Sequence, residues 1–402
     1  MSTGVEAEKH QGEAVPYPFA GGRGLELSGE YAKLLQDGEP IRVQLPYGDP
    51  AWLVTRYVDA RLVLTDRRFS RAEVTRRDEP RMTPRAIPES ILTMDPPDHT
   101  RVRTLVSKAF TARRIEGKRA WIGELAAKLV ADMRAAGAPA ELVGSYALAM
   151  PITVICEFLG VPEEDRAQLR SWCDAALSTN ELTDEECGQS FADMQDYFER
   201  LILERRAAPG DDLMSALIEA RDAHDRLTEP ELLGLCISIL IGGFETTASQ
   251  IPNFVHVLLE RPELWNRLCT DPELVPTAVE ELLRFVPFTA NGVSPRYPLE
   301  DVRVGNVLVR AGEPVVVDTS AANRDGQTFD EPEEVRLDRP DNRHMAFGHG
   351  PHHCLGAHLA RVELQEALKA LVQGMPGLRV HGEIEWKPDT TVRGPRTLHI
   401  SW

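Results

Sequence analysis

The longest apolar stretch of the chain, residues 232–244, lies inside a segment patterned as one long helix. Thr228 and Glu231 precede it with the spacing of a capping box, in which each side chain bonds an otherwise free backbone N–H group. The pattern stops at Pro262. The apolar run is shorter than the roughly 20 residues that a membrane span needs, and Glu245 ends it. We therefore predict a long helix in the core of a protein that does not enter a membrane.

Helical spacing of Leu and Ala also marks residues 355–374, and strand patterns fill two other regions. A hairpin pattern begins at Ile41, and short strands lie between residues 292 and 318, with turns around Gly305 and Gly312. No internal repeat and no Gly/Ser-rich linker divides these regions. We expect a mainly α fold with a long central helix and a smaller β-rich lobe, in a single domain over residues 16–402.

Two segments fall outside the regular pattern. Residues 1–15 are polar and charged, which fits neither a signal peptide nor an anchor, and we expect a disordered tail there. Residues 79–97 contain several prolines and form a long loop in the prediction; long loops without secondary structure are often functional.

Charge and cysteine usage narrow the functional classes. The 402-residue chain has a formal net charge of −18 and a pI near 5.1, so its field repels phosphates and we expect no nucleic-acid partner. Its six cysteines are spread without paired spacing, which fits a reducing compartment better than a disulfide framework. We expect a cytoplasmic protein.

The ten residues FGHGPHHCLG, numbered 347–356, place one cysteine where a thiolate is favoured. Cys354 stands directly before a predicted helix, whose first backbone N–H groups lack partners and favour negative charge. Gly350 and Gly356 flank it, where glycine permits a left-handed backbone or the approach of a flat ligand, and Phe347 provides a covering ring. This context favours a presented thiolate over a buried structural cysteine.

Zinc is an alternative, because His349, His352 and His353 stand beside Cys354 and all four are competent ligands. Structural zinc needs a second spaced pair of ligands, and the chain has no other Cys-x-x-Cys or Cys-x-x-His pair. A single axial bond from one sulfur is the interpretation that we prefer.

Inside the long helix, Gly242, Gly243 and Glu245 oppose local preference, since each glycine costs about 1 kcal/mol relative to alanine. A helix crossing that requires small residues would explain the glycines alone. Thr246, however, lies four residues after Gly242, so its hydroxyl can bond that carbonyl and open a groove in the helical ladder. An acid and an alcohol beside such a groove indicate a site where dioxygen could fit.

The loop around Cys354 resembles the signature of the cytochrome P-450 superfamily, the haem-thiolate monooxygenases. That signature is Phe-Gly-x-Gly-x-His/Arg-x-Cys-x-Gly, and the loop matches it at every fixed position. The resemblance implies that Cys354 is the proximal ligand of the iron in haem b, with Phe347 and His352 also binding the cofactor. It extends over nearly the whole chain from Ile41 to Trp402.

The segment Gly-Gly-Phe-Glu-Thr is similar to the oxygen-binding motif of the same family. By this resemblance Gly242 lies at the oxygen groove beside the cofactor. Thr246 and Glu245 are then the catalytic pair, the alcohol donating a hydrogen bond at the oxygen site and the acid relaying protons from solvent.

Glu281 and Arg284 are three residues apart and face the same way on a predicted helix. A surface ion pair is the commoner explanation for that spacing. Their position between the oxygen helix and the cysteine loop resembles the family's structural triad, which Arg339 would complete.

His99 and Arg103 stand four residues apart on another predicted helix, after a proline-ended loop. A solvated basic helix face would explain them locally. The resemblance implies instead that both bind the haem propionates, and that Arg296, among the short strands, does the same.

Taken together, the resemblance implies insertion of one oxygen atom from O2 into a small organic substrate by hydroxylation, epoxidation or oxidative coupling, as in natural-product tailoring. A peroxide-driven peroxygenase and a non-catalytic haem gas sensor are the alternatives; neither needs the Glu245 and Thr246 pair. We expect a monomer that takes electrons from a ferredoxin and its reductase. We also expect a basic docking patch formed by Arg101, Lys108, Arg113, Arg114, Arg343 and Arg361.

The residues expected to line the substrate pocket mix apolar and hydrogen-bonding side chains, which does not define a molecule. They are Leu92, Ile239, Gly243, Phe288, Thr289, Asn291, Thr391 and Val392.

Overall fold

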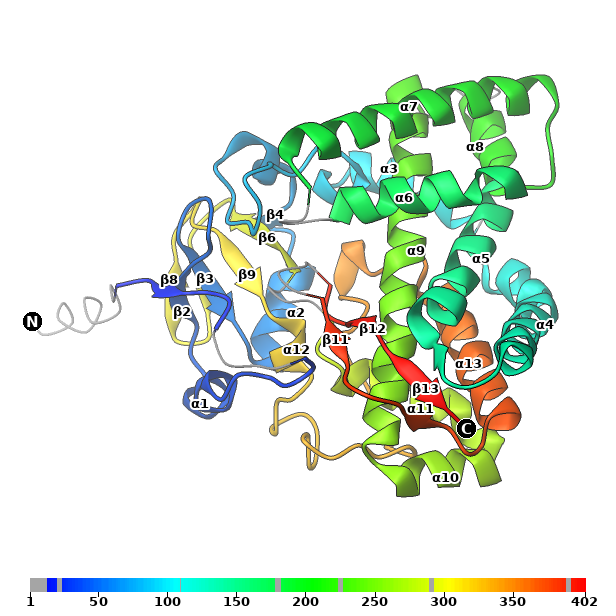
Figure 1. Ribbon diagram of the computed structural model, residues 1–402. Helices are drawn as coiled ribbons and strands as arrows, with labels where there is room; N and C mark the ends of the chain where they lie inside the picture. The colour runs from blue at the N-terminus through cyan, green and yellow to red at the C-terminus, as the bar shows by residue number, and fades with distance from the viewer. Residues whose placement is uncertain are drawn as a thin grey trace, which may run out of the picture. The chain divides into compact units, whose positions relative to one another are not determined.

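The computed structural model in Figure 1 describes residues 13–19, 24–108, 110–177, 182–222, 227–288, 293–387 and 392–402. Of the expected tail, residues 1–12 lie outside this described part. The chain groups into two compact units, each assembled from separate segments. Unit 1 comprises residues 1–95, 289–334 and 343–354, and unit 2 comprises residues 96–288, 335–342 and 355–402.

Unit 1 is built on a six-stranded mixed sheet. In spatial order its strands are β1 (Val15–Pro16), β2 (Ile41–Gln44), β3 (Ala51–Val54), β9 (Val315–Val317), β6 (Val293–Pro298) and β4 (Phe69–Ser70). β2 and β3 pair antiparallel with Ile41 opposite Leu53, which confirms the hairpin predicted at Ile41. A separate hairpin joins β7 (Val302–Val304) to β8 (Val307–Val309) through Gly305, whose φ is +56°.

Short helices complete unit 1. They are α1 (Glu30–Asp37), α2 (Tyr57–Thr65), α12 (Thr319–Ala322) and the 3-10 turns η1 (Ala72–Arg76), η2 (Ile91–Thr93) and η6 (Gly350–His352). Valines of β3 and β9 pack with Ala60 and Val63 of α2 in one apolar core. Fully buried Val and Leu side chains contribute about 1.5–3 kcal/mol each, so this core fixes α2 against the sheet. The long loop over residues 79–97 contains η2 as its one described helical turn.

Unit 2 is mainly helical. Its helices are α3 (Asp98–Ser107), α4 (Ala112–Ala136), α5 (Ala149–Leu159), α6 (Arg166–Leu177), α7 (Asp184–Ala207), α8 (Leu213–Asp222), α9 (Glu229–Leu259), α10 (Pro262–Thr270), α11 (Val275–Phe285) and α13 (Ala357–Gly374), with turns η3 (Val143–Ala147), η4 (Glu163–Asp165) and η5 (Pro272–Leu274). Two short sheets accompany them, β10 (Arg379–Val380), β13 (His399–Ser401) and β5 (Ala140–Glu141) in one, β11 (Glu385–Trp386) and β12 (Pro395–Thr397) in the other.

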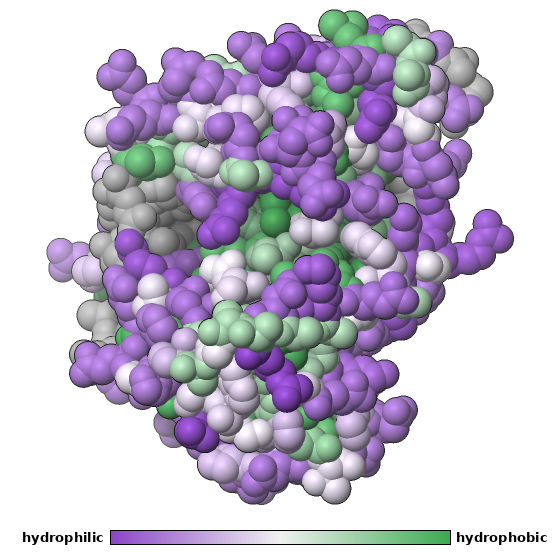
Figure 2. All heavy atoms as spheres, turned by 45° about the vertical axis from the view of Figure 1, so that its right-hand side comes forward, coloured by the Kyte–Doolittle hydropathy of each residue, from purple (hydrophilic) through white to green (hydrophobic). Residues whose placement is uncertain are grey.

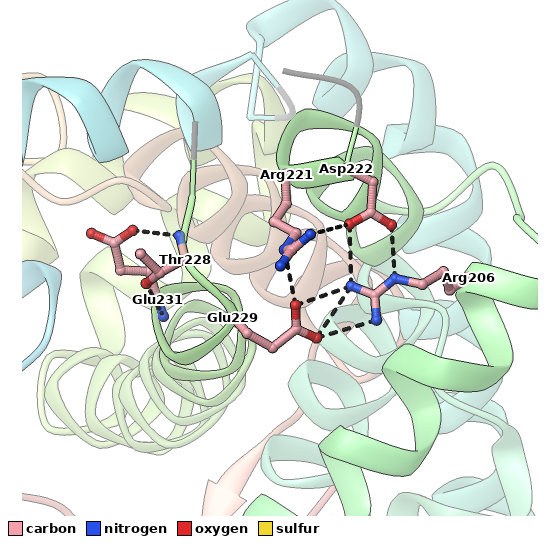
Figure 3. Close-up of polar contacts among 6 residues, drawn as sticks. All are labelled: Arg206, Arg221, Asp222, Thr228, Glu229 and Glu231. Carbon is pink, nitrogen blue, oxygen red and sulfur yellow. Dashed lines mark hydrogen bonds and ion pairs between the residues drawn. The ribbon is translucent and has the colours of Figure 1, made fainter. Parts of the chain in front are cut away.

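Helix α9 is the long core helix that the apolar pattern predicts. The capping box at its start is present, since Glu231 N–H donates to the Thr228 hydroxyl and Thr228 N–H to the Glu231 carboxylate, at 3.3 and 2.8 Å (Figure 3). Helices α5, α6, α7 and α13 all pack against it. It is the one described helix long and apolar enough to cross a membrane, and 56% of its most apolar window is buried inside the protein.

The visible surface is mostly polar. Hydrophilic residues predominate on the face in Figure 2, with apolar residues in patches between them. Large exposed apolar side chains such as Val58, Leu203 and Leu299 are spread over different elements. Isolated apolar residues of this kind are ordinary on soluble proteins.

Candidate active site

Unit 1 presents Cys354 at the end of a short closed loop. Turn η6 ends at His352, and the Cys354 backbone N–H then donates to the Phe347 carbonyl at 2.9 Å. The thiol is exposed and forms no disulfide. Helix α13 begins three residues later in the chain, at Ala357. The loop therefore holds the cysteine backbone while its sulfur remains accessible.

Glycine is required within this loop. Gly348 and Gly350 have φ values of +71° and +72°, a region that side chains rarely adopt. A Cβ on Gly350 would lie 2.3 Å from the Leu64 carbonyl oxygen, so the turn can pack on α2 only with glycine at this position. Gly356 differs, because its φ is −83° and nothing lies within 4 Å of the place a Cβ would take. Of the two glycines that flank Cys354, only Gly350 therefore has a left-handed backbone.

The histidines next to Cys354 do not form a metal centre with it. Within the described ranges no group of three or more His, Cys, Asp or Glu side chains is arranged to hold a metal ion. His352 is partly exposed at the end of η6, and the Phe347 ring lies 6.3 Å from that of His353. A single bond from the Cys354 sulfur stays a prediction.

Unit 1 also contains Arg296, buried on β6. The pKa of its guanidinium is lowered to about 9, first by burial and then by the positive charge of Arg71, while Asp95 acts in the opposite direction. Arg71 itself donates to the Leu92 carbonyl at 2.9 Å, and the Asp95 carboxylate accepts the Arg71 backbone N–H at 2.8 Å. Two cations are therefore buried close together, and the Asp95 carboxylate is an anion that acts on both.

In unit 2, α9 contains the hydrogen bond that the spacing predicts, within a helix that is continuous from Glu229 to Leu259. The Thr246 hydroxyl donates to the Gly242 carbonyl at 2.7 Å, and nothing lies within 4 Å of where a Cβ on Gly242 would be. A Cβ on Gly243 would instead lie 2.6 Å from Ile155 of α5. The two glycines therefore serve different purposes. Gly243 permits the close crossing of α9 and α5, and Gly242 leaves open space beside Thr246.

Glu245 is buried on α9 and has two partners that the sequence did not suggest. Its Oε1 accepts the Ser249 hydroxyl at 3.0 Å and forms a short ion pair with Lys387. Ser249 lies one helical turn after Glu245, a spacing that could have identified it. Lys387 is 142 residues away in the sequence, and no local signal indicates it.

Helix α3 holds His99 and Arg103 one turn apart, as their spacing predicts. His99 is buried and Arg103 is partly exposed. Arg101, between them, faces Glu231 at the start of α9 and bonds it at 2.5 and 3.2 Å. An arginine on a different face of the helix therefore forms the surface ion pair.

Glu281, Arg284 and Arg339 meet in unit 2, all of them buried. Glu281 accepts Arg284 Nε and Arg339 Nε at 2.9 Å each, and its other oxygen accepts a second Arg284 nitrogen at 2.8 Å. Asn342 and the Arg336 backbone N–H, which the sequence did not indicate, also bond this carboxylate. Burial would raise the pKa of Glu281, but the hydrogen bonds from Arg284 and Arg339 outweigh it and the pKa is lowered.

The expected pocket residues are only partly described. In unit 2 the Arg393 backbone N–H donates to the Phe288 carbonyl at 2.9 Å, which brings Phe288 beside buried Val392, and Ile239 is buried on α9. In unit 1 Leu92 is exposed on η2. Thr289, Asn291 and Thr391 lie outside the described residues.

Comparison with known proteins identifies the family. The family model for cytochrome P-450 matches residues 177–375. The mycinamicin IV hydroxylase/epoxidase of Micromonospora griseorubida is 49% identical over 96% of this chain and 98% of that enzyme. The nocardicin C N-oxygenase of Nocardia uniformis is 48% identical over 96% and 98% respectively.

A solved structure agrees in both fold and sequence. The LnmZ cytochrome P-450 hydroxylase from the leinamycin biosynthetic pathway of Streptomyces atroolivaceus superposes with a TM-score of 0.85 and 76% identity, covering 91% of this chain and 98% of that one. The mainly α fold with a β-rich part is confirmed by this match. Identity at this level over nearly the whole length establishes membership, and the chain is a haem b-dependent monooxygenase of the cytochrome P-450 family.

Proposed function

We propose that this enzyme tailors a natural product by inserting one oxygen atom at a carbon or heteroatom, with Cys354 as the thiolate that would hold the haem iron and Glu245 with Thr246 as the oxygen-activation pair. The relatives support this substrate class, since their names refer to mycinamicin IV, nocardicin C and the leinamycin pathway. The observation that carries the proposal is the acid and alcohol pair on α9, beside the open space at Gly242.

The residues of unit 1 fit a haem. An exposed cysteine follows a tight glycine turn, as a sulfur ligand to the haem iron would require. Burial lowers the pKa of Arg296, and a propionate carboxylate beside it would favour its charged form. His352 in unit 1 and His99 and Arg103 in unit 2 are the further proposed propionate ligands. When bound, haem supplies the redox centre at which dioxygen is activated.

The chain's own contribution is proton delivery. Thr246 Oγ1 donates to a carbonyl in the present arrangement and can rotate to donate into the space beside Gly242. Glu245 is the preceding residue in the sequence. Its partners among the described residues, Ser249 and Lys387, both bond Oε1, so Oε2 is the atom on which a proton can be held. A positioned acid and alcohol of this kind typically contribute about 100-fold or more to a proton-transfer step. A peroxygenase or a gas sensor has no need of the pair.

The electron donor in this proposal is a ferredoxin, supplied by its reductase. Of the cations expected to dock it, Arg101, Arg114 and Arg361 already pair with carboxylates, at Glu231, Asp211 and Glu280. Docking would therefore rely more on Lys108 and Arg113. We further infer a cytoplasmic monomer, consistent with the burial of α9 and the scattered exposed apolar residues.

The test compares Thr246→Ala with Thr247→Ala, which removes a hydroxyl from the next residue of the same helix. Purified enzyme is first titrated with macrolides, peptides and other natural products, following the ferric Soret band. Turnover of a binding compound then uses NADPH and surrogate redox partners. Thr246→Ala should keep haem and substrate affinity but convert most NADPH to peroxide, lowering product per NADPH by roughly tenfold or more, whereas Thr247→Ala should remain coupled.

Three outcomes separate the candidate functions. Product driven by peroxide but not by NADPH would identify a peroxygenase. Ligand binding without any product would identify a sensor. Full coupling in Thr246→Ala would remove the proton-delivery role while leaving family membership intact.

A further inference from the structure

The β11–β12 hairpin of unit 2 lies along one face of α9. Trp386 stacks edge-on against His256 with ring centroids 5.1 Å apart, and the Asn253 side-chain amide donates to the Arg393 carbonyl at 3.0 Å. Gly394 packs so closely that a Cβ there would lie 3.3 Å from Asn253 Oδ1. These contacts follow a helical spacing along α9 and continue toward Glu245, so the hairpin is aligned with the acid.

Lys387 follows β11 directly and is itself held in the hairpin. Its backbone N–H donates to the Gly394 carbonyl at 3.0 Å, and its ammonium group bonds both Glu245 Oε1 and, at 3.1 Å, the Ser249 hydroxyl. The side chains of Glu245 and Lys387 are only 7% and 19% exposed. An ion pair this sheltered is screened far less by salt than a surface pair, and its geometry is defined by three converging bonds.

A second carboxylate acts on the same pair. Asp174 of α6, which packs against α9, has a pKa raised to about 6, first by partial burial and then by the negative charge of Glu245, while Arg170 and then Lys387 lower it. Cys173 on the same helix also lies in the field of Glu245. Lys387 therefore pairs with Glu245 and, together with Arg170, offsets the charge of Asp174.

We propose that Lys387 is a positioning residue for the oxygen-activation acid: it fixes the Glu245 carboxylate through Oε1 and leaves Oε2 to take up and release the proton. The proposal rests on the catalytic role proposed for Glu245. Lys387 only donates hydrogen bonds; the proton that moves comes from solvent and is held at Oε2. Proton delivery is thereby coupled to the seating of the C-terminal hairpin on α9.

The experiment compares Lys387→Met, Lys387→Arg and Glu245→Gln with Arg396→Met as the matched control. Arg396 is a cation on β12 of the same hairpin, pairs with Glu385, and is half exposed. Lys387→Met should lower product per NADPH by roughly tenfold, since misdirecting a proton donor removes much of its typical 100-fold contribution. Lys387→Arg should restore most of the coupling, and Arg396→Met should match the wild type.

Two further measurements separate positioning from hairpin packing. Urea midpoints measured without substrate give the loss of stability in Lys387→Met, in Glu245→Gln and in the double variant. The loss in the double variant should be smaller than the sum of the two single losses, as expected for residues in direct contact. The solvent isotope effect on NADPH-driven turnover should rise in Lys387→Met and return in Lys387→Arg.

Coupled turnover in Lys387→Met alongside uncoupled Glu245→Gln would overturn the inference. A second result would also overturn it: a coupling defect that is the same in Lys387→Met and Lys387→Arg, together with equally weakened substrate binding in the two variants. That result would show that Lys387 acts through packing. If Glu245→Gln itself stays coupled, the proposed role of the acid fails first, and the Lys387 inference fails with it.

Discussion

Two clusters of charged residues in unit 2 use the same residue types in opposite environments. The Glu281 cluster, Glu281 with Arg284 and Arg339, joins α11 to the segment that precedes the cysteine loop in the chain, and the side chains of Glu281 and Arg284 are 0% exposed. The Glu229 cluster joins the ends of α7 and α8 to the start of α9 (Figure 3). Its members, Arg206, Arg221, Asp222 and Glu229, are between 29% and 48% exposed.

Hydrogen bonding is equally rich in both clusters. Arg206 bonds Asp222 at 2.7 Å and Glu229 at 3.1 Å, and Arg221 reaches the same two carboxylates. In the Glu281 cluster both oxygens of one carboxylate are filled by two arginines. The number of bonds therefore does not distinguish the clusters, and their access to water does.

That difference decides what each cluster contributes. Exposed pairs gain little, typically about 0–1 kcal/mol, because water and salt compete with them. A buried pair gains little net stability as well, but removing one partner leaves an uncompensated charge that costs about 3–5 kcal/mol. The Glu281 cluster thus specifies one arrangement of α11 and residues 335–342, whereas the Glu229 cluster only adds modest support to helix ends that are fixed by other contacts.

The largest expected effect is the loss of stability caused by Glu281→Gln. This substitution preserves the shape of the side chain but removes the charge that both buried arginines require. We expect a loss of about 3–5 kcal/mol in the free energy of unfolding, independent of salt, measured by urea denaturation at low and high NaCl. Glu280→Gln is the matched control, since Glu280 is the preceding residue and pairs with partly exposed Arg361. Equal losses in the two variants would show that burial does not distinguish these ion pairs.

A smaller effect follows from pH. The pKa of Glu281 is lowered in the folded protein, so its charge contributes stability that is present above the ordinary value near 4.5 and is lost as the pH falls through the folded pKa. The stability difference between wild type and Glu281→Gln should therefore be constant from pH 7 to about 5 and shrink below it. Urea midpoints measured at several pH values test this, and a difference that grows on acidification would contradict it.

Local features of the fold were readable from the sequence. The capping box and Pro262 bracket α9, the hairpin at Ile41 is present, and Thr246 bonds the Gly242 carbonyl as its spacing suggests. All of these depend on residues within one or two turns of each other, where backbone geometry fixes which groups meet. The family resemblance, which rested on the ten residues around Cys354 and on motifs elsewhere in the chain, is confirmed by the family model and the relatives.

Contacts between distant segments were not readable. Lys387 and Glu245 are 142 residues apart, and nothing in the sequence indicated that pair. Arg339 lies 58 residues from Glu281, and only the family resemblance, not the pattern, indicated their contact. Periodicity describes one element at a time and carries no information on which elements pack together. The grouping into two units of three segments each could not be read from the sequence for the same reason. A single domain over residues 16–402 stays a prediction.

The smallest expected effect is on Arg206→Gln, which removes the central cation of the Glu229 cluster. We expect a loss of about 1 kcal/mol or less at low ionic strength. It should vanish in 1 M NaCl, where the screening length falls to about 3 Å. Thr228→Ala is the control at the same end of α9, because a neutral capping hydroxyl contributes about 1 kcal/mol through a hydrogen bond that salt does not screen. If the loss of stability in Arg206→Gln persists in high salt, the Glu229 cluster behaves like the buried Glu281 cluster. Exposure to water would then not explain the difference between the two clusters.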